Sequence, residues 1–326
     1  MKTPEFAIDF NYFMDYKTFE KTVLTAERLG YHSVWYMDHL IWKGERLPWN
    51  EAGAVLECWT VLSAIASATK RIRLGPLVSC NSYRNPALVA KMAATLDVIS
   101  NGRLEFGIGA GWKEDEYLAY GYPFPNPPTR IGQLKEAVQI IKKMWTEEKP
   151  SFQGKYYQIN EAVCEPKPIQ KPHPPIWIGG GGEKLTLKLV AELANGYNWR
   201  ATPEDYKRKL EVLRERCKQV GRDFDSIKKS IWIPVIIDED EKALEKKVQV
   251  LSAKVEATTS KPREASEHIS LSKEEWLSRR IVGTPEQCIN RIHEYIDAGV
   301  ELFLLNFAGL EKDMKLFAET VIPEFR

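Results

Sequence analysis

The dipeptide Asp38-His39 carries the side chains in this sequence best suited to proton transfer. Of the five histidines, only His39 lies at the end of a segment with the pattern of a buried strand, Ser33–Met37. Imidazole titrates near neutral pH, so His39 can act as a general acid or base. Asp38 either fixes the imidazole tautomer or contacts a ligand; alternatively, it caps the following helix. We predict that His39 and Asp38 are catalytic.

A run of four glycines forms a second candidate site. The run is Gly179, Gly180, Gly181 and Gly182, and it leads into the helical segment KLTLKLVAEL. Backbone amides at the start of a helix bind anions, and glycines let a phosphate reach the backbone. The alternative is a flexible turn, but ordering four glycines costs conformational entropy unless something holds them. Because the P-loop pattern GxxxxGK[ST] is absent, we predict a phosphate site of another kind.

Alternating glycines mark a third candidate site. Its residues are Gly107, Ile108, Gly109, Ala110, Gly111 and Trp112. A strand end without side chains, with an aromatic residue just beyond it, favours a planar ligand lying across the sheet edge. Close packing at a tight strand-to-helix turn would explain the same glycines.

The composition excludes several classes of function. With 46 Lys plus Arg and 45 Asp plus Glu, the formal net charge is +1, so no overall field attracts nucleic acid or an anionic membrane. The N-terminal MKTPEFAIDFNYF lacks the apolar region of a signal peptide, and no apolar run is long enough to span a membrane. The five cysteines are scattered without a CxxC, and HExxH is absent. We expect a soluble cytoplasmic protein without a metal site or disulfide framework.

These candidates require a scaffold that brings distant segments together. Glycine repeatedly separates a segment with helical spacing from a short apolar strand, which is the pattern of βα units around a parallel sheet. The predicted strands are Phe6–Phe10, Ser33–Met37, Arg73–Val78, Arg103–Ile108, Ile176–Gly179, Gly196–Trp199, Ile231–Ile237 and Glu301–Asn306. Such a set predicts an α/β fold, the (β/α)8 TIM barrel, with a last helix near Glu311–Val321. A doubly wound sheet would need a glycine-rich turn after the first strand, but FAIDFNYFMD contains no glycine.

In a TIM barrel, ligands bind at the C-terminal ends of the strands. The residues at those ends are Asn11, Asp38-His39, Ser79-Cys80-Asn81, Gly107 to Trp112, Gly179 to Gly182, Trp199-Arg200 and Asn306. We predict one domain over residues 1–326, with three insertions over the barrel mouth. They are a Trp-rich loop at Trp42–Gly53, a hairpin and proline-rich connector at Pro150–Pro175, and a lid or excursion at about 238–276. A solvated helix with a disordered tail explains the last segment equally well.

Four stretches resemble the bacterial luciferase-like flavin and deazaflavin oxidoreductases. They are AERLGYHSVWYMDH, IRLGPLVSCNSYRNPALVAKMAATLDVISNGRLEFGIGAGWKEDEYLAYG, PPIWIGGGGEKLTLKLVAELANGYNW and GTPEQCINRIHEYIDAGVELFLL, in this order along the chain. The resemblance implies a TIM barrel with the tricyclic ring of the coenzyme at its C-terminal mouth. It implies that the strand-five loop, here Gly179 to Gly182, holds the phosphate. It also implies a non-proline cis peptide between Leu77 and Val78, behind the ring.

The pair Asp38-His39, followed by Trp42, resembles the branch that uses the deazaflavin coenzyme F420. We therefore expect F420, with FMN as the alternative. By this resemblance the coenzyme ring contacts Asp38, Leu77, Val78, Ser79, Gly109, Ala110, Gly111 and Trp112, and the substrate pocket contains Asn11, Trp42, Trp112 and Trp199. Some F420-dependent dehydrogenases place a glutamate general acid directly after the glycines, where this chain has Trp112. The nearest acids are Glu114, Asp115 and Glu116.

Three functions remain open at this point. We expect an F420-dependent oxidoreductase that transfers hydride between the deazaflavin and a small organic substrate, because the barrel would position the coenzyme that supplies the chemistry. The second is an FMN-dependent two-component monooxygenase, and the third is a non-catalytic flavin-binding barrel. Apolar outer helices such as Pro86–Ile99 allow a homodimer.

Overall fold

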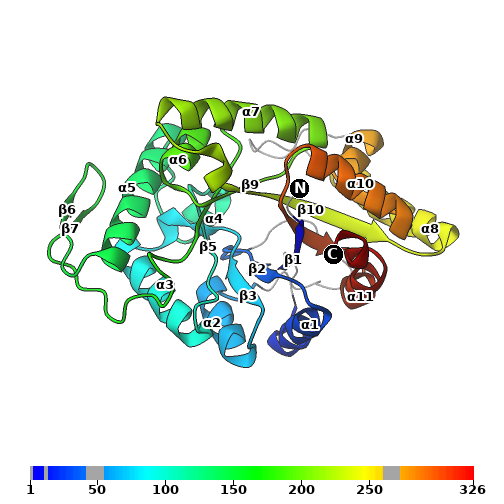
Figure 1. The fold of residues 1–326 in the computed structure, drawn as a ribbon, viewed down its shortest axis with the longest axis horizontal. Coiled ribbons are helices and arrows are strands. Elements are labelled where there is room, and N and C mark those ends of the chain that lie inside the picture. Colours follow the sequence, from blue (N-terminus) through cyan, green and yellow to red (C-terminus); the bar gives the residue numbers. More distant parts are fainter. Residues whose placement is uncertain (1–2, 11–13, 42–54, 260–271) are drawn as a thin grey trace.

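A closed ring of parallel strands forms the centre of the molecule (Figure 1). The computed structural model describes residues 3–10, 14–41, 55–259 and 272–326. Neighbouring strands follow the order β3-β2-β1-β12-β10-β9-β8-β5-β4. β3 and β4 are two parts of one interrupted strand, and Leu74 of β3 bridges to Leu104 just before β5, which closes the ring. The predicted TIM barrel is therefore confirmed.

The strands lie close to their predicted positions. Their bounds are β1 (Glu5–Phe10), β2 (Ser33–Tyr36), β3 (Arg73–Pro76), β4 (Ser79–Cys80), β5 (Phe106–Gly109), β8 (Ile176–Gly179), β9 (Gly196–Trp199), β10 (Lys228–Ile237), β11 (Ile281–Gly283) and β12 (Leu302–Phe307). β11 lies outside the ring and pairs with the last residues of the long strand β10.

Helices surround the ring on all sides in Figure 1. Those that follow the βα repeat are α1 (Tyr16–Leu29), α2 (Cys58–Ala68), α3 (Pro86–Ser100), α5 (Pro127–Thr146), α6 (Thr186–Leu193), α7 (Pro203–Gln219), α10 (Pro285–Asp297) and α11 (Leu310–Thr320). Additional helices are α4 (Glu114–Ala119), α8 (Glu241–Thr259) and α9 (Lys273–Ser278). The described residues contain no helix that is long and apolar enough to cross a membrane.

Local chemistry sets the helix ends and hence where each strand begins. The Asp15 side chain accepts a hydrogen bond from the Thr18 amide and starts α1, and Asn126 caps α5 through the Thr129 amide. Gly30 ends α1 with φ of 80°, a left-handed conformation that glycine adopts without a Cβ clash. The chain therefore turns at once into β2, as the glycine junctions predicted.

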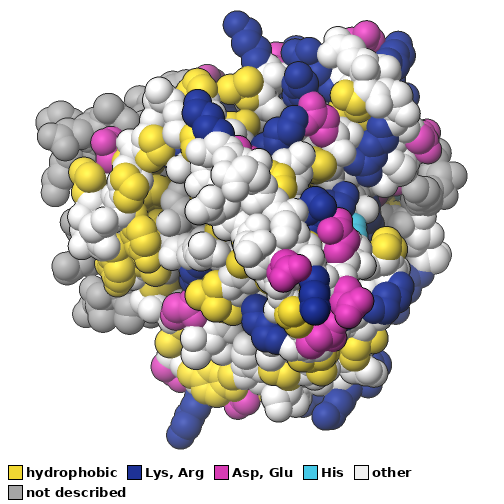
Figure 2. Space-filling view, turned by 90° about the vertical axis from the view of Figure 1, so that its left-hand side faces the viewer, with side chains coloured by type: hydrophobic (Ala, Val, Ile, Leu, Met, Phe, Trp, Pro, Cys, Tyr) yellow, Lys and Arg dark blue, Asp and Glu magenta, His cyan; other side chains and the backbone are white. Residues whose placement is uncertain are grey.

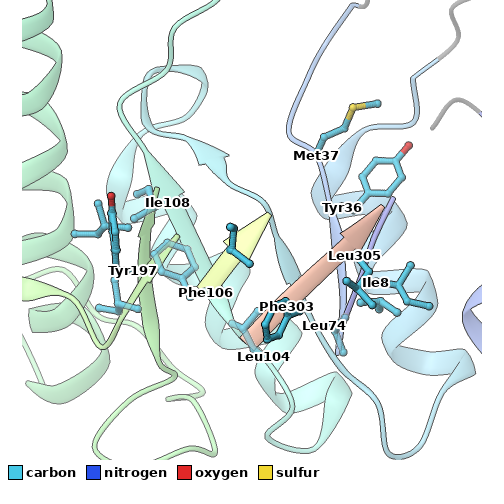
Figure 3. Packing of buried hydrophobic residues seen from close by; sticks show 14 of the residues in the cluster. Ile8, Tyr36, Met37, Leu74, Leu104, Phe106, Ile108, Tyr197, Phe303 and Leu305 are labelled. Carbon is cyan, nitrogen blue, oxygen red and sulfur yellow. The ribbon is translucent and has the colours of Figure 1, made fainter. Parts of the chain in front are cut away.

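The hydrophobic core lies between the strands and the helices. Successive strand residues point to opposite faces of a sheet, so one set packs outward against the helices. Figure 3 shows this layer, with Ile8, Leu74, Phe106, Tyr197 and Phe303 among its labelled side chains. Each of these five side chains is fully buried or nearly so.

A second, smaller cluster fills the inside of the barrel. Its residues are Ala7, Trp35, Trp177, Leu302 and Leu304, with Leu77 and Trp232 packed against them. The Trp35 and Trp177 rings meet edge to face with centroids 5.6 Å apart. The lower barrel is therefore packed solid, which restricts ligand binding to the mouth.

The predicted hairpin is present as β6 (Phe152–Gln153) and β7 (Gln158–Ile159), an antiparallel pair that extends beyond α5 in Figure 1. Glu136 of α5 anchors it by accepting hydrogen bonds from the amides of Lys155, Tyr156 and Tyr157. In the segment 238–276, α8 and part of α9 are helical, while residues 260–271 and the loop Trp42–Gly53 lie outside the described residues. The lid stays a prediction.

The surface on this side of the molecule mixes charge and apolar groups. Figure 2 shows acidic and basic side chains interspersed over the face that carries the hairpin, with hydrophobic side chains between them. On α3, the exposed fractions of Leu88, Val98 and Ile99 are 54%, 38% and 44%. These residues supply apolar surface of the kind that the predicted homodimer requires, and the dimer itself stays a prediction.

Candidate functional site

His39 is held by Glu116, a fully buried residue of α4. The His39 Nδ1 atom lies 2.7 Å from Glu116 Oε2, and the other carboxylate oxygen accepts the amides of Leu40 and Ile41 at 2.7 and 2.9 Å. The Tyr83 hydroxyl donates to Oε2 at 3.1 Å. An ionised carboxylate only accepts, so this geometry assigns the proton to Nδ1 and directs Nε2 to chemistry.

The charge state of Glu116 follows from these bonds. Burial by itself would raise the pKa of Glu116, but the hydrogen bond and charge of His39, the Ile41 amide and Lys113 together hold that pKa below its ordinary value. Glu116 therefore remains an anion that orients the imidazole. This corrects the prediction that Asp38 could fix the His39 tautomer.

Asp38 has a different set of partners. Its carboxylate accepts two hydrogen bonds from Arg84, at 2.7 and 2.9 Å, and one from the Cys80 amide at 2.8 Å. The Ser79 hydroxyl lies 3.2 Å away. Among the described residues the next helix is α2, and its N-cap is Glu57 rather than Asp38. The carboxylate therefore ties the end of β2 to β4, and its predicted contact with the coenzyme stays a prediction.

The interruption of the third barrel strand lies where the resemblance placed it. The peptide between Leu77 and Val78 is cis, as predicted. A Cβ atom at Gly109 would come within 2.7 Å of Val78 Cγ2, and at Gly107 and Gly179 within 3.1 and 3.2 Å of a Val78 methyl carbon. Close packing of Val78 thus accounts for Gly109 and contributes at Gly179, whereas a Cβ at Gly107 would lie 2.1 Å from the Pro76 carbonyl oxygen. The mouth keeps a floor with few side chains.

The turn after β5 is equally tight. Gly111 has φ of 75°, and its Cα faces the Tyr117 hydroxyl so closely that no Cβ would fit. Trp112 follows with half of its surface exposed, and its ring meets the His39 ring edge to face at 5.9 Å. Trp112 is therefore beside the imidazole, and its role as a wall of the pocket stays a prediction.

The four glycines connect β8 to the start of α6. Gly180 has φ of 133°, and a Cβ at Gly181 would overlap the Trp199 ring. Lys209 of α7 donates to the Gly181 carbonyl at 2.8 Å and to Glu183 at 3.1 Å, and Arg208 also pairs with Glu183. The loop therefore combines open backbone at a helix N-terminus with two cations, which suits a phosphate.

Sequence reasoning missed Lys209 and Arg208, which are charged residues of an ordinary helix in the sequence. The Trp199 ring lies against Gly181 and near Lys209, and its predicted place in the substrate pocket stays a prediction. On β9, the inward-facing residues are Gly196 and Asn198, which contact Trp177 and Ser230. The alternation therefore points Arg200, rather than Trp199, into the barrel.

A second polar network lies inside the mouth on β1, β9, β10 and β12. The Asp9 carboxylate accepts from the Trp232 indole at 2.7 Å and from Asn306 at 3.2 Å. The Arg200 guanidinium lies over the Trp232 ring, 4.8 Å from its centroid. Burial raises the pKa of Asp9 to about 7, against the opposing effect of the hydrogen bonds from Trp232 and Asn306.

The remaining predicted site residues are placed as follows. Ser79 is buried and bonds Asp38 and the Trp59 indole, and Ala110 is half-buried beside Tyr117. Asn11 and Trp42 lie outside the described residues. Within the described part of the chain, no group of three His, Cys, Asp or Glu side chains could hold a metal ion.

Comparison with known proteins identifies relatives along almost the whole chain. The sequence profile of the family described as luciferase-like monooxygenase matches residues 3–302. The chain is 31% identical to an F420-dependent glucose-6-phosphate dehydrogenase of Kineococcus radiotolerans, covering 92% of this chain and 90% of the relative. Its identity to the enzyme of the same name from Microbacterium testaceum is 30%, covering 92% and 91%.

Solved structures share the fold at lower sequence identity. The coenzyme F420-dependent tetrahydromethanopterin reductase of Methanopyrus kandleri is 24% identical, with a TM-score of 0.80 over 99% of both chains. An F420-dependent secondary alcohol dehydrogenase is 22% identical, with a TM-score of 0.81 over 100% of both chains. The long-chain alkane monooxygenase LadA is 16% identical, with a TM-score of 0.79 over 99% of this chain and 91% of that one.

Proposed function

We propose that this chain, which belongs to the luciferase-like monooxygenase family, is an F420-dependent oxidoreductase that acts on a small organic substrate. The observation that carries the proposal is the His39–Glu116 pair at the barrel mouth, an oriented proton-transfer group beside the expected ring site. Full-length relatives named for F420 support the predicted coenzyme over FMN.

The residues present fit a phosphorylated tricyclic coenzyme. Val78 and the glycines around it give a floor on which a planar ring can lie. Gly179 to Gly182, with Lys209 and Arg208, would hold the phosphate. When bound there, the deazaflavin supplies the carbon that gives or receives hydride.

The protein's own contribution is proton transfer and exclusion of water. Glu116 keeps the His39 ring oriented, so Nε2 can give a proton to the substrate oxygen or take one from it. Trp112 covers one side of the imidazole. By the family resemblance, some F420-dependent dehydrogenases have a glutamate general acid where this chain has Trp112. We therefore assign the proton transfer to His39 and leave the substrate as a small organic molecule.

The test is a binding titration of the full chain with F420 and with FMN, followed by turnover with a panel of small alcohols, aldehydes and sugar phosphates. We expect tighter binding of F420, and in His39→Ala a loss of turnover of about a hundredfold or more with nearly unchanged F420 affinity. His173→Ala is the control, since His173 contacts the Pro174 carbonyl and the Trp145 ring away from the mouth. Tighter FMN binding with oxygen consumption, or full turnover in His39→Ala, would reject the proposal.

A further inference from the structure

The loop that follows β4 contacts the candidate site but has no role in the proton transfer described above. It begins with a short 3-10 turn, η1 (Asn81–Tyr83). The Tyr83 hydroxyl donates to Glu116, and the next residue, Arg84, donates to Asp38. The loop therefore reaches two carboxylates of the site, and the contact from Tyr83 leads through one of them to the reactive histidine.

We propose that Tyr83 is a positioning residue for the proton transfer, because its hydroxyl shares the Glu116 carboxylate with His39 and limits how strongly that carboxylate attracts the imidazole proton. This inference rests on the proposed function, since it concerns the same proton-transfer group. Tyr83 acts on the basicity of His39 through Glu116, and this role requires no contact with substrate or coenzyme.

The two donors converge on one oxygen atom of the carboxylate. Glu116 Oε2 accepts the Tyr83 hydroxyl at 3.1 Å and faces His39 Nδ1 at 2.7 Å. The amides of Leu40 and Ile41 bind the other oxygen, Oε1. If the hydroxyl is removed, the charge of Oε2 acts on the imidazole alone and favours its protonated form more strongly. Loss of the Tyr83 hydroxyl should therefore make His39 a stronger base.

Tyr83 keeps its proton near neutral pH and so remains a donor. Burial, together with the charges of Cys80 and Glu116, raises the pKa of Tyr83 well above its ordinary value. The other titratable or charged groups around the pair are Cys80, Tyr117, Lys113 and the ion-paired Asp38 and Arg84. Burial raises the pKa of Cys80 to about 11 and also raises that of Tyr117. A change in this cluster near neutral pH therefore points to the His39–Glu116 pair.

Packing fixes the direction of the Tyr83 hydroxyl. The Tyr83 side chain is buried, and its ring packs against the rings of Tyr117 and Tyr122 with centroids 5.1 and 5.3 Å apart. The Tyr122 hydroxyl donates to the Tyr83 carbonyl at 3.0 Å. At the start of the same turn, Asn81 donates to the Tyr157 hydroxyl at 3.2 Å, which ties the turn to the hairpin. A donor held in this way presents its hydroxyl at one place, as the support of a catalytic group requires.

NMR of the full chain with 15N-labelled histidine tests the proposal without turnover, and His39→Gln identifies the His39 signals. Tyr83→Phe keeps the packed ring and removes only the hydroxyl. We expect the pH midpoint of the His39 signals to rise by about half a unit, a fraction of the effect of one hydrogen bond. Tyr31→Phe is the matched control, because the buried Tyr31 hydroxyl donates to the Met314 carbonyl just before β2, at the end of the barrel away from the mouth. Thermal melts show whether each variant is folded.

Two further measurements separate an effect on His39 from a loss of packing. Fluorine makes a phenol a stronger hydrogen-bond donor, so 3-fluorotyrosine in place of Tyr83 should lower the same midpoint, which a residue that only fills space would leave unchanged. In turnover with F420, the limb of the pH profile of kcat that reports His39 should move with the NMR midpoint, while F420 affinity stays the same.

The outcomes distinguish this proposal from the proposed function. A folded Tyr83→Phe with the His39 midpoint of the wild type would overturn the proposal and leave Tyr83 as a packing residue of the aromatic cluster, even if His39-dependent turnover stands. A wild type without turnover would reject the proposed function instead, and the NMR comparison would still decide whether Tyr83 controls the basicity of His39.

Discussion

The two sides of the barrel mouth differ in how completely their polar groups are paired. On the His39 side, each oxygen of Glu116 accepts hydrogen bonds, and Asp38 is closed by Arg84 and Cys80. On the Arg200 side, a buried guanidinium nitrogen has no partner, and Asp9 receives neutral donors only. The first side is preorganised by the protein itself, and the second side has polar groups without charged hydrogen-bond partners.

The difference in pairing gives the carboxyl groups of Glu116 and Asp9 different protonation states at the same barrel mouth. A buried carboxylate with charged or backbone donors stays ionised and can orient a base, whereas one with few neutral donors takes up a proton. Glu116 and Asp9 are such a pair, since the pKa of Glu116 lies below its ordinary value and that of Asp9 is raised to about 7. Environments that separate the pKa values of two acids are typical of active sites.

The largest expected effect is on stability, in Asp9→Asn. The folded pKa of Asp9, about 7, exceeds its ordinary value of 3.8, so its contribution to the free energy of unfolding is complete below pH 4 and is lost as pH rises towards 7. Asparagine has no such loss. We expect Asp9→Asn to be more stable than the wild type at pH 8, by up to about 4 kcal/mol, with little difference at pH 4.

Urea unfolding at several pH values measures this difference. If the advantage of Asp9→Asn does not grow between pH 4 and pH 8, Asp9 is paired with a cation, and the contrast between the two sides of the mouth disappears. Asp15→Asn is the control, because the hydrogen bonds from Thr18 lower the pKa of this exposed N-cap residue, so its removal cannot produce an advantage that grows with pH.

The next effect is on turnover, in Glu116→Gln. Glutamine preserves the shape of the side chain but removes the negative charge. It has one acceptor oxygen instead of two, so its NH2 group must face either His39 Nδ1 or the Leu40 and Ile41 amides. We expect kcat to fall about a hundredfold with little change in coenzyme affinity. Steady-state kinetics check this, with the neighbouring exposed residue in Glu114→Gln as control; an unchanged kcat would mean that the orientation of the imidazole is irrelevant.

The smallest effect concerns the glycine loop, in Lys209→Met. The variant loses the cation next to the Gly181 carbonyl, so F420 affinity should fall about tenfold, the effect of one charge-assisted hydrogen bond. Lys207 lies two positions earlier, on the exposed side of α7, and Lys207→Met should bind F420 as the wild type does. Affinity for the deazaflavin core without phosphate should be unchanged; a fall there would place Lys209 near the ring instead.

The fold could be predicted well from the sequence because most strands have a recognisable local sequence pattern. Gly30 and Asn101 end their helices in the left-handed conformation, and a short apolar strand follows each. The short apolar strands Ile176–Gly179 and Gly196–Trp199 were predicted to the residue. The third strand was predicted as one piece, whereas the structure breaks it between β3 and β4. The family was also predictable, since its motifs occur in order along the chain.

The site was predictable only where its residues are neighbours in sequence. His39 and its partner Glu116 are 77 positions apart, and nothing in the local pattern shows which of three consecutive acids turns inward. Asp9 is a single acid inside an apolar strand, so it resembles an exposed edge position until the partners on β10 and β12 are known. Such pairings arise from closure of the barrel, which the periodicity of one segment does not encode.

The contact of Val78 with three glycines has a consequence for the evolution of this chain. One of its methyl groups would be 2.7 Å from a Cβ at Gly109, and its methyl groups also crowd the Cβ positions of Gly107 and Gly179. Positions 78 and 109 are therefore expected to change together, since a descendant that acquires alanine at Gly109 needs a smaller residue 78. Covariation between these positions should be detectable across an alignment of descendants, although Gly109 lies in β5 and Val78 between β3 and β4.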